Sequence, residues 1–196
     1  MSTRRGTADP DLFVERGFLD PAALDELFAA VRASEGRPAT VYGRGDSGAV
    51  DERVRRTTRV CPPPEVEELV RRLLLSRRRA AEERFGLTLK ELEEPQFLRY
   101  GPGDHFVAHQ DGNTGMLRSD REDRKVSAVI FLNTQTETPG PETYGGGTLV
   151  FHPRATPERL RFPGEAGTLL LFRAETTHEV EPVTRGERFT IASWYR

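Results

Sequence analysis

The sequence lacks most of the features that mark exported or membrane proteins. It has a single cysteine, Cys61, so no intramolecular disulfide can form, which is typical of proteins from a reducing cytosol. No apolar run approaches the roughly 20 residues that a membrane helix needs. Arg4 and Arg5 lie near the start of the chain, but no apolar stretch follows them, and we expect no signal peptide. These absences favour a cytoplasmic protein with no membrane partner.

An excess of charge of one sign is also missing. Lys and Arg total 29 and Asp and Glu total 31, which gives a net charge of −2 and no general attraction for nucleic acid. Only Lys90 and Lys125 are lysines, and this preference for arginine is typical of a GC-rich bacterial genome. Arginine clusters at 71–72 and 77–79 alternate with glutamates, which favours a solvated helix face over a nucleic-acid site. Nothing in the sequence specifies an oligomeric state.

The order of the predicted elements indicates one domain, residues 1–196. A helical N-terminal part covers about 11–90, and short strands separated by Gly, Pro and Asn turns cover about 95–196. This order favours a mainly β fold with N-terminal helices packed on a double-stranded β-helix, that is, a cupin-like jelly roll.

Two helices are predicted in the first part. Asp20 followed by Pro21 predicts a helix start, and the apolar spacing then continues to Gly36. A second helix is predicted over 64–85, with Gly86 as its stop. The glycines at 145–147 are not followed by a lysine or a helical pattern, so a flexible loop is favoured over a phosphate cradle.

His109, Asp111 and His178 form a His-x-Asp motif followed at long range by a second histidine. Residues two apart on a strand point to the same face, so His109 and Asp111 can bind one ion together. With His178 as a third ligand, half of the coordination sphere stays open. Two histidines and one carboxylate are typical of non-haem Fe(II) oxygenases, whereas structural zinc prefers four closed ligands. The three residues are therefore candidate metal ligands.

Arg188 begins a strand-forming run ten residues after His178. Alternation places three further side chains on its face, namely Thr190, Ala192 and Trp194. A buried guanidinium without a partner is very costly, and a dicarboxylate co-substrate would supply that partner through a bidentate pair. Arg188 is therefore a candidate anchor for such a co-substrate.

Five sequence blocks resemble, in order, the prolyl 4-hydroxylase-like branch of the 2-oxoglutarate and Fe(II)-dependent dioxygenases. They are residues 98–111, 125–133, 145–151, 164–172 and 178–195. The resemblance implies that the His109, Asp111 and His178 side chains bind Fe(II). It also implies that Arg188 holds the distal carboxylate of 2-oxoglutarate, in a pocket lined by Tyr100 and Trp194.

The chain departs from this family at two positions. Phe131 stands where oxygen-sensing relatives have a tyrosine that helps to bind the co-substrate carboxylate. Thr190, on the Arg188 face, is the first candidate for the missing hydroxyl and Ser127 the second. His105 stands where an aromatic residue is common. It is expected to point to the same strand face as His109, two pleats away, and is a candidate substrate contact.

The resemblance implies a hydroxylase of unactivated C–H bonds that uses Fe(II), 2-oxoglutarate and O2, and it admits ascorbate as a further ligand. A prolyl or related residue in a peptide or protein is the favoured substrate, and a free amino acid or small natural-product metabolite is the alternative. A nucleic-acid demethylase is less favoured because the chain is not basic. A non-enzymatic jelly-roll binding module is also less favoured, because it would not need Arg188.

The segment between the two predicted helices is long and rich in glycine and arginine, which favours function over mere linkage. We expect residues 39–52, which include Arg44, to form a lid over substrate. Arg55 or Arg59 is then expected to reach the mouth of the site. Residues 116–124 are the alternative place for substrate recognition.

Overall fold

The computed structural model describes residues 11–40, 50–112, 123–153 and 157–196. The helices are α1 (Pro21–Ala33), α2 (Pro64–Leu75) and α3 (Arg78–Phe85). The strands are β1 (Leu12–Glu15), β2 (Gly36–Pro38), β3 (Arg55–Arg56), β4 (Thr58–Val60), β5 (Gln96–Tyr100), β6 (His105–His109), β7 (Val126–Phe131), β8 (Gly145–Gly146), β9 (Leu149–Phe151), β10 (Leu160–Phe162), β11 (Leu169–Arg173), β12 (His178–Val180), β13 (Val183–Arg185) and β14 (Arg188–Tyr195).

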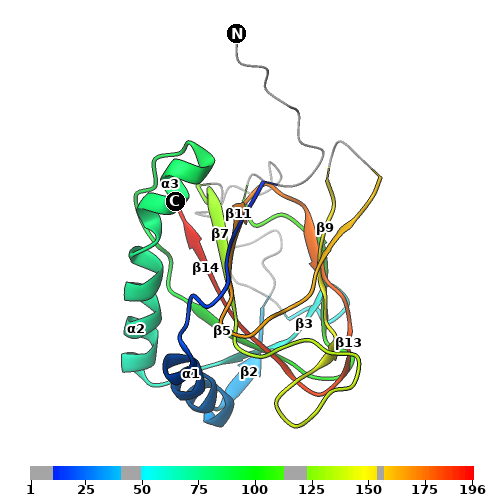
Figure 1. The fold of residues 1–196 in the computed structure, drawn as a ribbon. Helices are drawn as coiled ribbons and strands as arrows, with labels where there is room; N and C mark the ends of the chain where they lie inside the picture. The colour runs from blue at the N-terminus through cyan, green and yellow to red at the C-terminus, as the bar shows by residue number, and fades with distance from the viewer. Residues whose placement is uncertain (1–10, 41–49, 113–122, 154–156) are drawn as a thin grey trace.

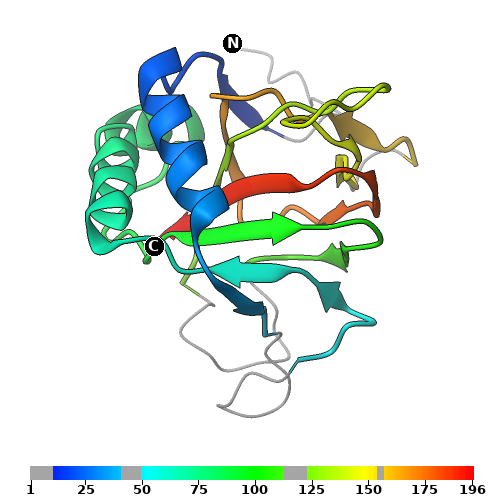
Figure 2. The same cartoon turned by 90° about the horizontal axis from the view of Figure 1, so that it is seen from below.

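Two antiparallel sheets form the body of the molecule. The larger sheet has the strand order β1-β11-β7-β14-β5-β4-β2, and the smaller has the order β10-β9-β12-β6-β3. The short strands β13 and β8 form a separate pair. The helices lie together on the outer face of the larger sheet (Figures 1 and 2). The mainly β fold with N-terminal helices, predicted from the sequence, is therefore confirmed.

The first helix begins where the sequence predicts but ends earlier. The Asp20 carboxylate accepts a hydrogen bond from the Ala23 amide at 3.0 Å, which caps the helix at its first turn. The helix ends at Ala33, and Gly36 lies in β2 instead of marking the helix stop. A Cβ atom at Gly36 would overlap the Thr58 side chain of β4, so this close pairing requires glycine.

The single helix predicted over 64–85 is wrong, because two helices, α2 and α3, occupy this segment. At the break, the Ser76 hydroxyl donates to the Leu73 carbonyl at 2.6 Å, a local bond that competes with helix continuation. The Arg77 amide bonds three residues back, to Leu74, and its guanidinium pairs with Glu15 of β1 at 2.8 Å. The chain therefore turns where it is tied to β1.

The predicted stop of the second helix is correct. Gly86 adopts a left-handed conformation with φ of 63°, and its amide bonds to the Glu82 carbonyl. Among the described residues, no helix is long and apolar enough to cross a membrane.

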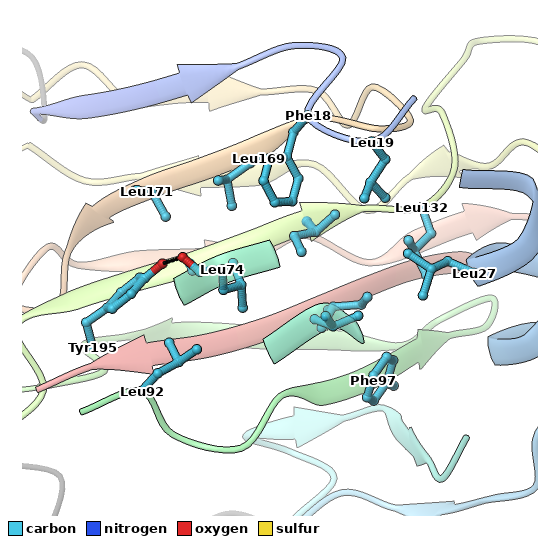
Figure 3. Close-up of a cluster of buried hydrophobic side chains, with 14 of the residues drawn as sticks. Phe18, Leu19, Leu27, Leu74, Leu92, Phe97, Leu132, Leu169, Leu171 and Tyr195 are labelled. Carbon is cyan, nitrogen blue, oxygen red and sulfur yellow. Dashed lines mark hydrogen bonds between the residues drawn. The ribbon is translucent and has the colours of Figure 1, made fainter. Parts of the chain in front are cut away.

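The larger sheet is buried on both faces. Its outer face packs against the helices through side chains that include Leu27, Leu74, Phe97, Leu169 and Tyr195 (Figure 3). The Tyr195 hydroxyl donates to the Leu74 carbonyl at 2.7 Å, the bond drawn dashed in Figure 3, and so joins β14 to α2. A second cluster fills the space between the sheets, and it contains Leu98, Tyr100, Phe131, Leu149, Phe151, Leu170, Phe172, Val180 and Val183.

A first prediction concerns the helix-covered core. Leu27 of α1 is fully buried there, so Leu27→Ala should lower the free energy of unfolding by about 2–5 kcal/mol through lost burial and a residual cavity. Chemical denaturation measures this change. Arg79→Ala on the exposed face of α3 is the control, and we expect it to change stability by less than about 0.5 kcal/mol. Similar losses in both variants would contradict the assignment of this core.

Candidate active site

His109 and His178 face each other across two neighbouring strands. His109 ends β6, His178 begins β12, and the two residues are direct register partners. Asp111 follows β6, and its Oδ1 and Oδ2 atoms lie 3.5 Å from the Nε2 atoms of His109 and His178, respectively. One ligand atom from each residue lies within 4.8 Å of the others. Adjacent ligands of one ion, each about 2.1 Å from it, lie about 3 Å apart, so this cluster can hold a metal after a small contraction.

A β-bulge sets which side chains share the face of His109. Val180 pairs with Phe106 while His178 pairs with His109, so β6 carries one extra residue in this interval. Phe106 consequently stacks on the His109 ring, with centroids 3.6 Å apart and planes at 17°. The expectation that His105 shares the face of His109 is therefore wrong. Its Nδ1 instead lies 3.2 Å from the Gly103 carbonyl.

Both histidine rings are oriented by backbone carbonyls. Nδ1 of His109 lies 2.8 Å from the Val107 carbonyl, and Nδ1 of His178 lies 2.9 Å from the Thr176 carbonyl. A carbonyl can only accept, so each Nδ1 carries the proton. Each Nε2 is then left with a lone pair for a metal.

Asp111 is positioned by a close approach of three chain segments. The amides of Asp111 and Gly112 both donate to the Ala174 carbonyl at 3.0 Å. A Cβ atom at Gly112 would lie 2.5 Å from the Arg124 carbonyl, so only glycine allows this approach. The Ser127 hydroxyl of β7 then donates to Asp111 Oδ2 at 2.7 Å. These contacts fix the carboxylate against the larger sheet.

The protonation states of the site suit metal binding. Burial lowers the pKa of His178 to about 4, and the charge of His109 acts in the same direction, so the imidazole is neutral at pH 7. Burial would raise the pKa of Asp111, but the two histidines and a hydrogen bond from Trp194 outweigh it and hold this pKa below its usual value. A neutral imidazole and an ionised carboxylate are the forms that ligate metals.

Arg188 lies buried on the inner face of β14, with 2% of its surface exposed. Its Nη1 donates to the Thr190 hydroxyl at 3.1 Å, and its guanidinium lies 5.0 Å from the Tyr100 ring and 5.5 Å from the Phe131 ring. No carboxylate pairs with it in the described part of the chain, and its Nε has no hydrogen-bond partner there. This arrangement leaves a buried positive charge that an anionic ligand can neutralise.

A profile of the 2OG-Fe(II) oxygenase superfamily matches residues 95–196, the segment that carries the His109, Asp111 and His178 cluster. The chain belongs to this superfamily.

Curated relatives extend the match within the superfamily. A PKHD-type hydroxylase of Paracoccus denitrificans is 33% identical over 159 residues, which are 80% of this chain and 66% of that protein. A PKHD-type hydroxylase of Klebsiella pneumoniae is 36% identical over 111 residues, which are 54% of this chain and 44% of that protein. The chain thus covers less than two thirds of the length of these relatives.

Solved structures share the fold of this chain. A prolyl-4-hydroxylase of Pseudomonas putida superposes with a TM-score of 0.67 at 26% identity, covering 96% of this chain and 94% of that one. A prolyl hydroxylase of Trichoplax adhaerens, solved with a hypoxia inducible factor peptide fragment, superposes with a TM-score of 0.70 at 18% identity. The latter covers 95% of this chain and 83% of that one. The jelly-roll prediction is confirmed by this likeness.

The residues of the site fit the two groups that the superfamily name contains, Fe(II) and 2-oxoglutarate. Two histidines and one carboxylate, with open positions beside them, are the donor set of non-haem Fe(II). The buried, uncompensated charge of Arg188 suits the free carboxylate of 2-oxoglutarate.

The sequence-predicted pocket residues separate into two groups in the structure. Tyr100 and Thr190 lie beside Arg188, as expected for a co-substrate pocket. Ser127 and Trp194 are direct register partners on β7 and β14, and both bond to Asp111 instead.

Tyr144 is a neighbour of Arg188 that sequence reasoning missed. It is fully buried, it precedes the glycines at 145–147, and its pKa responds to the charge of Arg188. The only sequence signal is that an aromatic residue begins a segment otherwise interpreted as a flexible loop.

The arginines predicted to contact substrate do not lie together. Arg55 is half-buried on β3, next to β6, and it lines a cavity of about 240 Å³. Arg59 on β4 lines a different cavity of about 330 Å³ with Glu93 and Arg196. Arg44 and most of the predicted lid, as well as residues 116–122, lie outside the described residues.

A second prediction concerns Ser127. Ser127→Ala removes the hydrogen bond that orients Asp111, so we expect metal affinity to fall about 10–100-fold. Anaerobic calorimetric titration with Co(II) measures this affinity. Ser193→Ala is the matched control, because Ser193 is also a buried serine but donates to the Glu93 carbonyl, away from the metal cluster. Equal affinity of the Ser127 variant and the unchanged protein would contradict the positioning role.

Proposed function

We propose that the protein is an Fe(II)- and 2-oxoglutarate-dependent dioxygenase that hydroxylates an unactivated C–H bond of a residue in a peptide or protein, in the manner of prolyl hydroxylases. The observation that carries the proposal is the cluster of His109, Asp111 and His178, whose ligand atoms converge within 4.8 Å. In this proposal they bind Fe(II), and Arg188 binds 2-oxoglutarate.

Each part of the site has a defined task in this reaction. Bound Fe(II) with 2-oxoglutarate and O2 supplies the oxidising chemistry, with succinate and carbon dioxide as co-products. Ser127 and the Gly112 turn keep the Asp111 carboxylate oriented toward the metal. Arg188 fixes the far end of the co-substrate, so that its oxo-acid end is presented to the iron. The packed side chains between the sheets exclude water from this end of the pocket.

Arg55 is the candidate substrate contact on the metal side of the site. Its guanidinium lies 4.9 Å from the centre of the Phe106 ring, and Phe106 stacks on His109, so the three side chains form one continuous stack. Nε of Arg55 is buried without a hydrogen-bond partner in the described segments. We propose that it binds a carbonyl or carboxylate oxygen of the substrate.

The likeness to the Pseudomonas putida prolyl-4-hydroxylase, at 26% identity over nearly the whole chain, supports a peptide substrate. A free amino acid or a small metabolite is the alternative. An arginine that binds an acceptor oxygen suits both classes, since a peptide offers carbonyls and an amino acid offers a carboxylate.

A third prediction tests the cofactor assignment. Anaerobic addition of Fe(II) and 2-oxoglutarate should give a weak visible charge-transfer band, and His178→Ala should abolish it. Arg188→Ala should raise the apparent KM for 2-oxoglutarate at least ~tenfold while iron affinity hardly changes, because charged hydrogen bonds are worth ~1.5–3 kcal/mol each. Thr190→Val should act in the same direction with a smaller effect.

The cofactor assignment fails if the His178 variant keeps the band at full strength. The anchor assignment fails if Arg188→Ala leaves the dependence on 2-oxoglutarate untouched. Mass spectrometry of a lysate supplied with iron and 2-oxoglutarate, with and without the protein, then identifies the substrate as the species that gains one oxygen.

A fourth prediction concerns Arg55 and uses the substrate found in that way. Arg55→Gln should reduce substrate hydroxylation at least ~tenfold, because one charged hydrogen bond is lost. Decarboxylation of 2-oxoglutarate without substrate should remain, since Arg55 contacts Phe106 and is separated by it from the metal ligand His109. Parallel assays of the oxidised product and of succinate measure the two activities.

Arg53→Gln is the control for Arg55. Its side chain is 91% exposed and, among the described residues, pairs with Asp51, so the same change of charge there should leave both activities intact. A parallel loss of both activities in the Arg55 variant would mean that Arg55 supports the stack on His109 and not the substrate.

A further inference from the structure

Two buried polar atoms without partners lie in the pocket of Arg188. One is the Arg188 Nε, and the other is the hydroxyl oxygen of Tyr144; neither has a hydrogen-bond partner of good geometry among the described residues, and the polar group that acts on the Tyr144 hydroxyl is the Arg188 guanidinium itself. Tyr144 has 0% of its surface exposed and Arg188 has 2%, so neither atom is in contact with bulk solvent. An unsatisfied buried polar group destabilises the folded state, and such groups in a native protein need an explanation.

The two side chains are adjacent. A Cβ atom built on Gly147 would lie 3.1 Å from Cδ of Arg188 and 3.2 Å from Cε2 of Tyr144, so both side chains pack on the same glycine. Burial raises the pKa of Tyr144 above its ordinary value, although the charge of Arg188 and a side-chain hydrogen bond with it act in the opposite direction. The phenol therefore stays protonated at neutral pH, as a donor and not as a counter-ion for Arg188.

Within the described segments, no carboxylate pairs with either of the two side chains. Thr190 contributes a hydroxyl that accepts a bond from Arg188 Nη1, and the Tyr100 and Phe131 rings supply apolar walls. A ligand that satisfies this pocket must bring acceptor oxygens and a negative charge. A carboxylate meets both requirements, and a neutral group would leave the guanidinium uncompensated.

We propose that the Tyr144 hydroxyl donates a hydrogen bond to the distal carboxylate of 2-oxoglutarate, beside the guanidinium of Arg188. Tyr144 thereby supplies a phenolic donor from the loop before β8, whereas Phe131 on β7 has none to offer. This inference rests on the proposed function, because it takes 2-oxoglutarate as the ligand.

Gly164 keeps the Tyr144 hydroxyl in this position. A Cβ atom at Gly164 would overlap the hydroxyl oxygen of Tyr144 and would lie 2.8 Å from Cδ1 of Phe131. Any larger residue there must displace the phenol or the Phe131 ring. Glycine at position 164 therefore leaves room for the hydroxyl group of Tyr144. A phenylalanine at position 144 would not need this room.

The fifth prediction is that Tyr144→Phe raises the Kd for 2-oxoglutarate at least ~tenfold, as expected for one charged hydrogen bond. Anaerobic titration of the Fe(II)-loaded protein, followed by the charge-transfer band, measures this Kd without turnover. The Kd for pyruvate, an oxo acid without the distal carboxylate, should not change in this variant.

Thermal unfolding separates binding from structure. Tyr144→Phe should not lower the Tm of the ligand-free protein, because the lost hydroxyl makes no hydrogen bond of good geometry among the described residues, but the rise in Tm on adding 2-oxoglutarate should shrink. Tyr195→Phe is the matched control: its buried hydroxyl bonds to the Leu74 carbonyl, so the Tm should fall and the Kd for 2-oxoglutarate should stay unchanged.

The possible outcomes distinguish this inference from the proposed function. If the unchanged protein shows no band with Fe(II) and 2-oxoglutarate, the proposed function itself fails. If the band forms and Tyr144→Phe binds 2-oxoglutarate as tightly as the unchanged protein, the inference about Tyr144 is wrong. A loss of Tm in ligand-free Tyr144→Phe with an unchanged Kd would likewise overturn it in favour of a structural role.

Discussion

The alternation of side chains along β14 ties the stability of the fold to its binding site. Phe189, Ile191 and Tyr195 point outward into the helix-covered core, while Arg188 and Thr190 point between the sheets. Because a strand has a period of two, a register slip of one residue would exchange these sets and place a guanidinium under the helices. The apolar contacts with α1 and α2 therefore hold Arg188 in the pocket, although they lie on the opposite face of the sheet.

That position has a large electrostatic cost in the ligand-free protein. Removing a charge from water costs several kcal/mol even after relaxation, whereas contacts with aromatic faces return about 0.5–2 kcal/mol each. The Tyr100 and Phe131 rings and the Thr190 hydroxyl thus offset only part of the cost. An anion that binds Arg188 removes the remainder, so ligand binding and stability are linked through this one side chain.

The parts of the site that follow from strand periodicity could be predicted from the sequence. The pairing of His109 with Asp111 and the face of Arg188 both depend on residues two apart, which one chain segment determines by itself. The later histidine was found instead from its order in the motif. The β6 bulge could not be predicted, because a bulge is defined by the register of a partner strand, and it puts Phe106 in place of His105 beside His109. The break at Ser76 was missed for a similar reason, since Arg77 is held by Glu15 on a distant strand.

Tyr144 was missed because its environment is assembled from three separate segments. Its ring meets Gly147, its hydroxyl faces Gly164, and its neighbour Arg188 comes from β14. In the sequence these glycines are indistinguishable from those of a flexible loop.

The two sheets supply different parts of the proposed reaction. Arg188, Ser127 and Trp194 belong to the larger sheet, which the helices cover, whereas His109 and His178 belong to the smaller sheet. The smaller sheet ends at β3, a two-residue edge strand that carries Arg55. Few packing contacts depend on such an edge, so its residues can change with less effect on stability than residues of β14. In this proposal, 2-oxoglutarate binds to residues of β14, where substitutions disturb the packed core. The substrate binds beside the edge strand β3, where substitutions have less effect on stability.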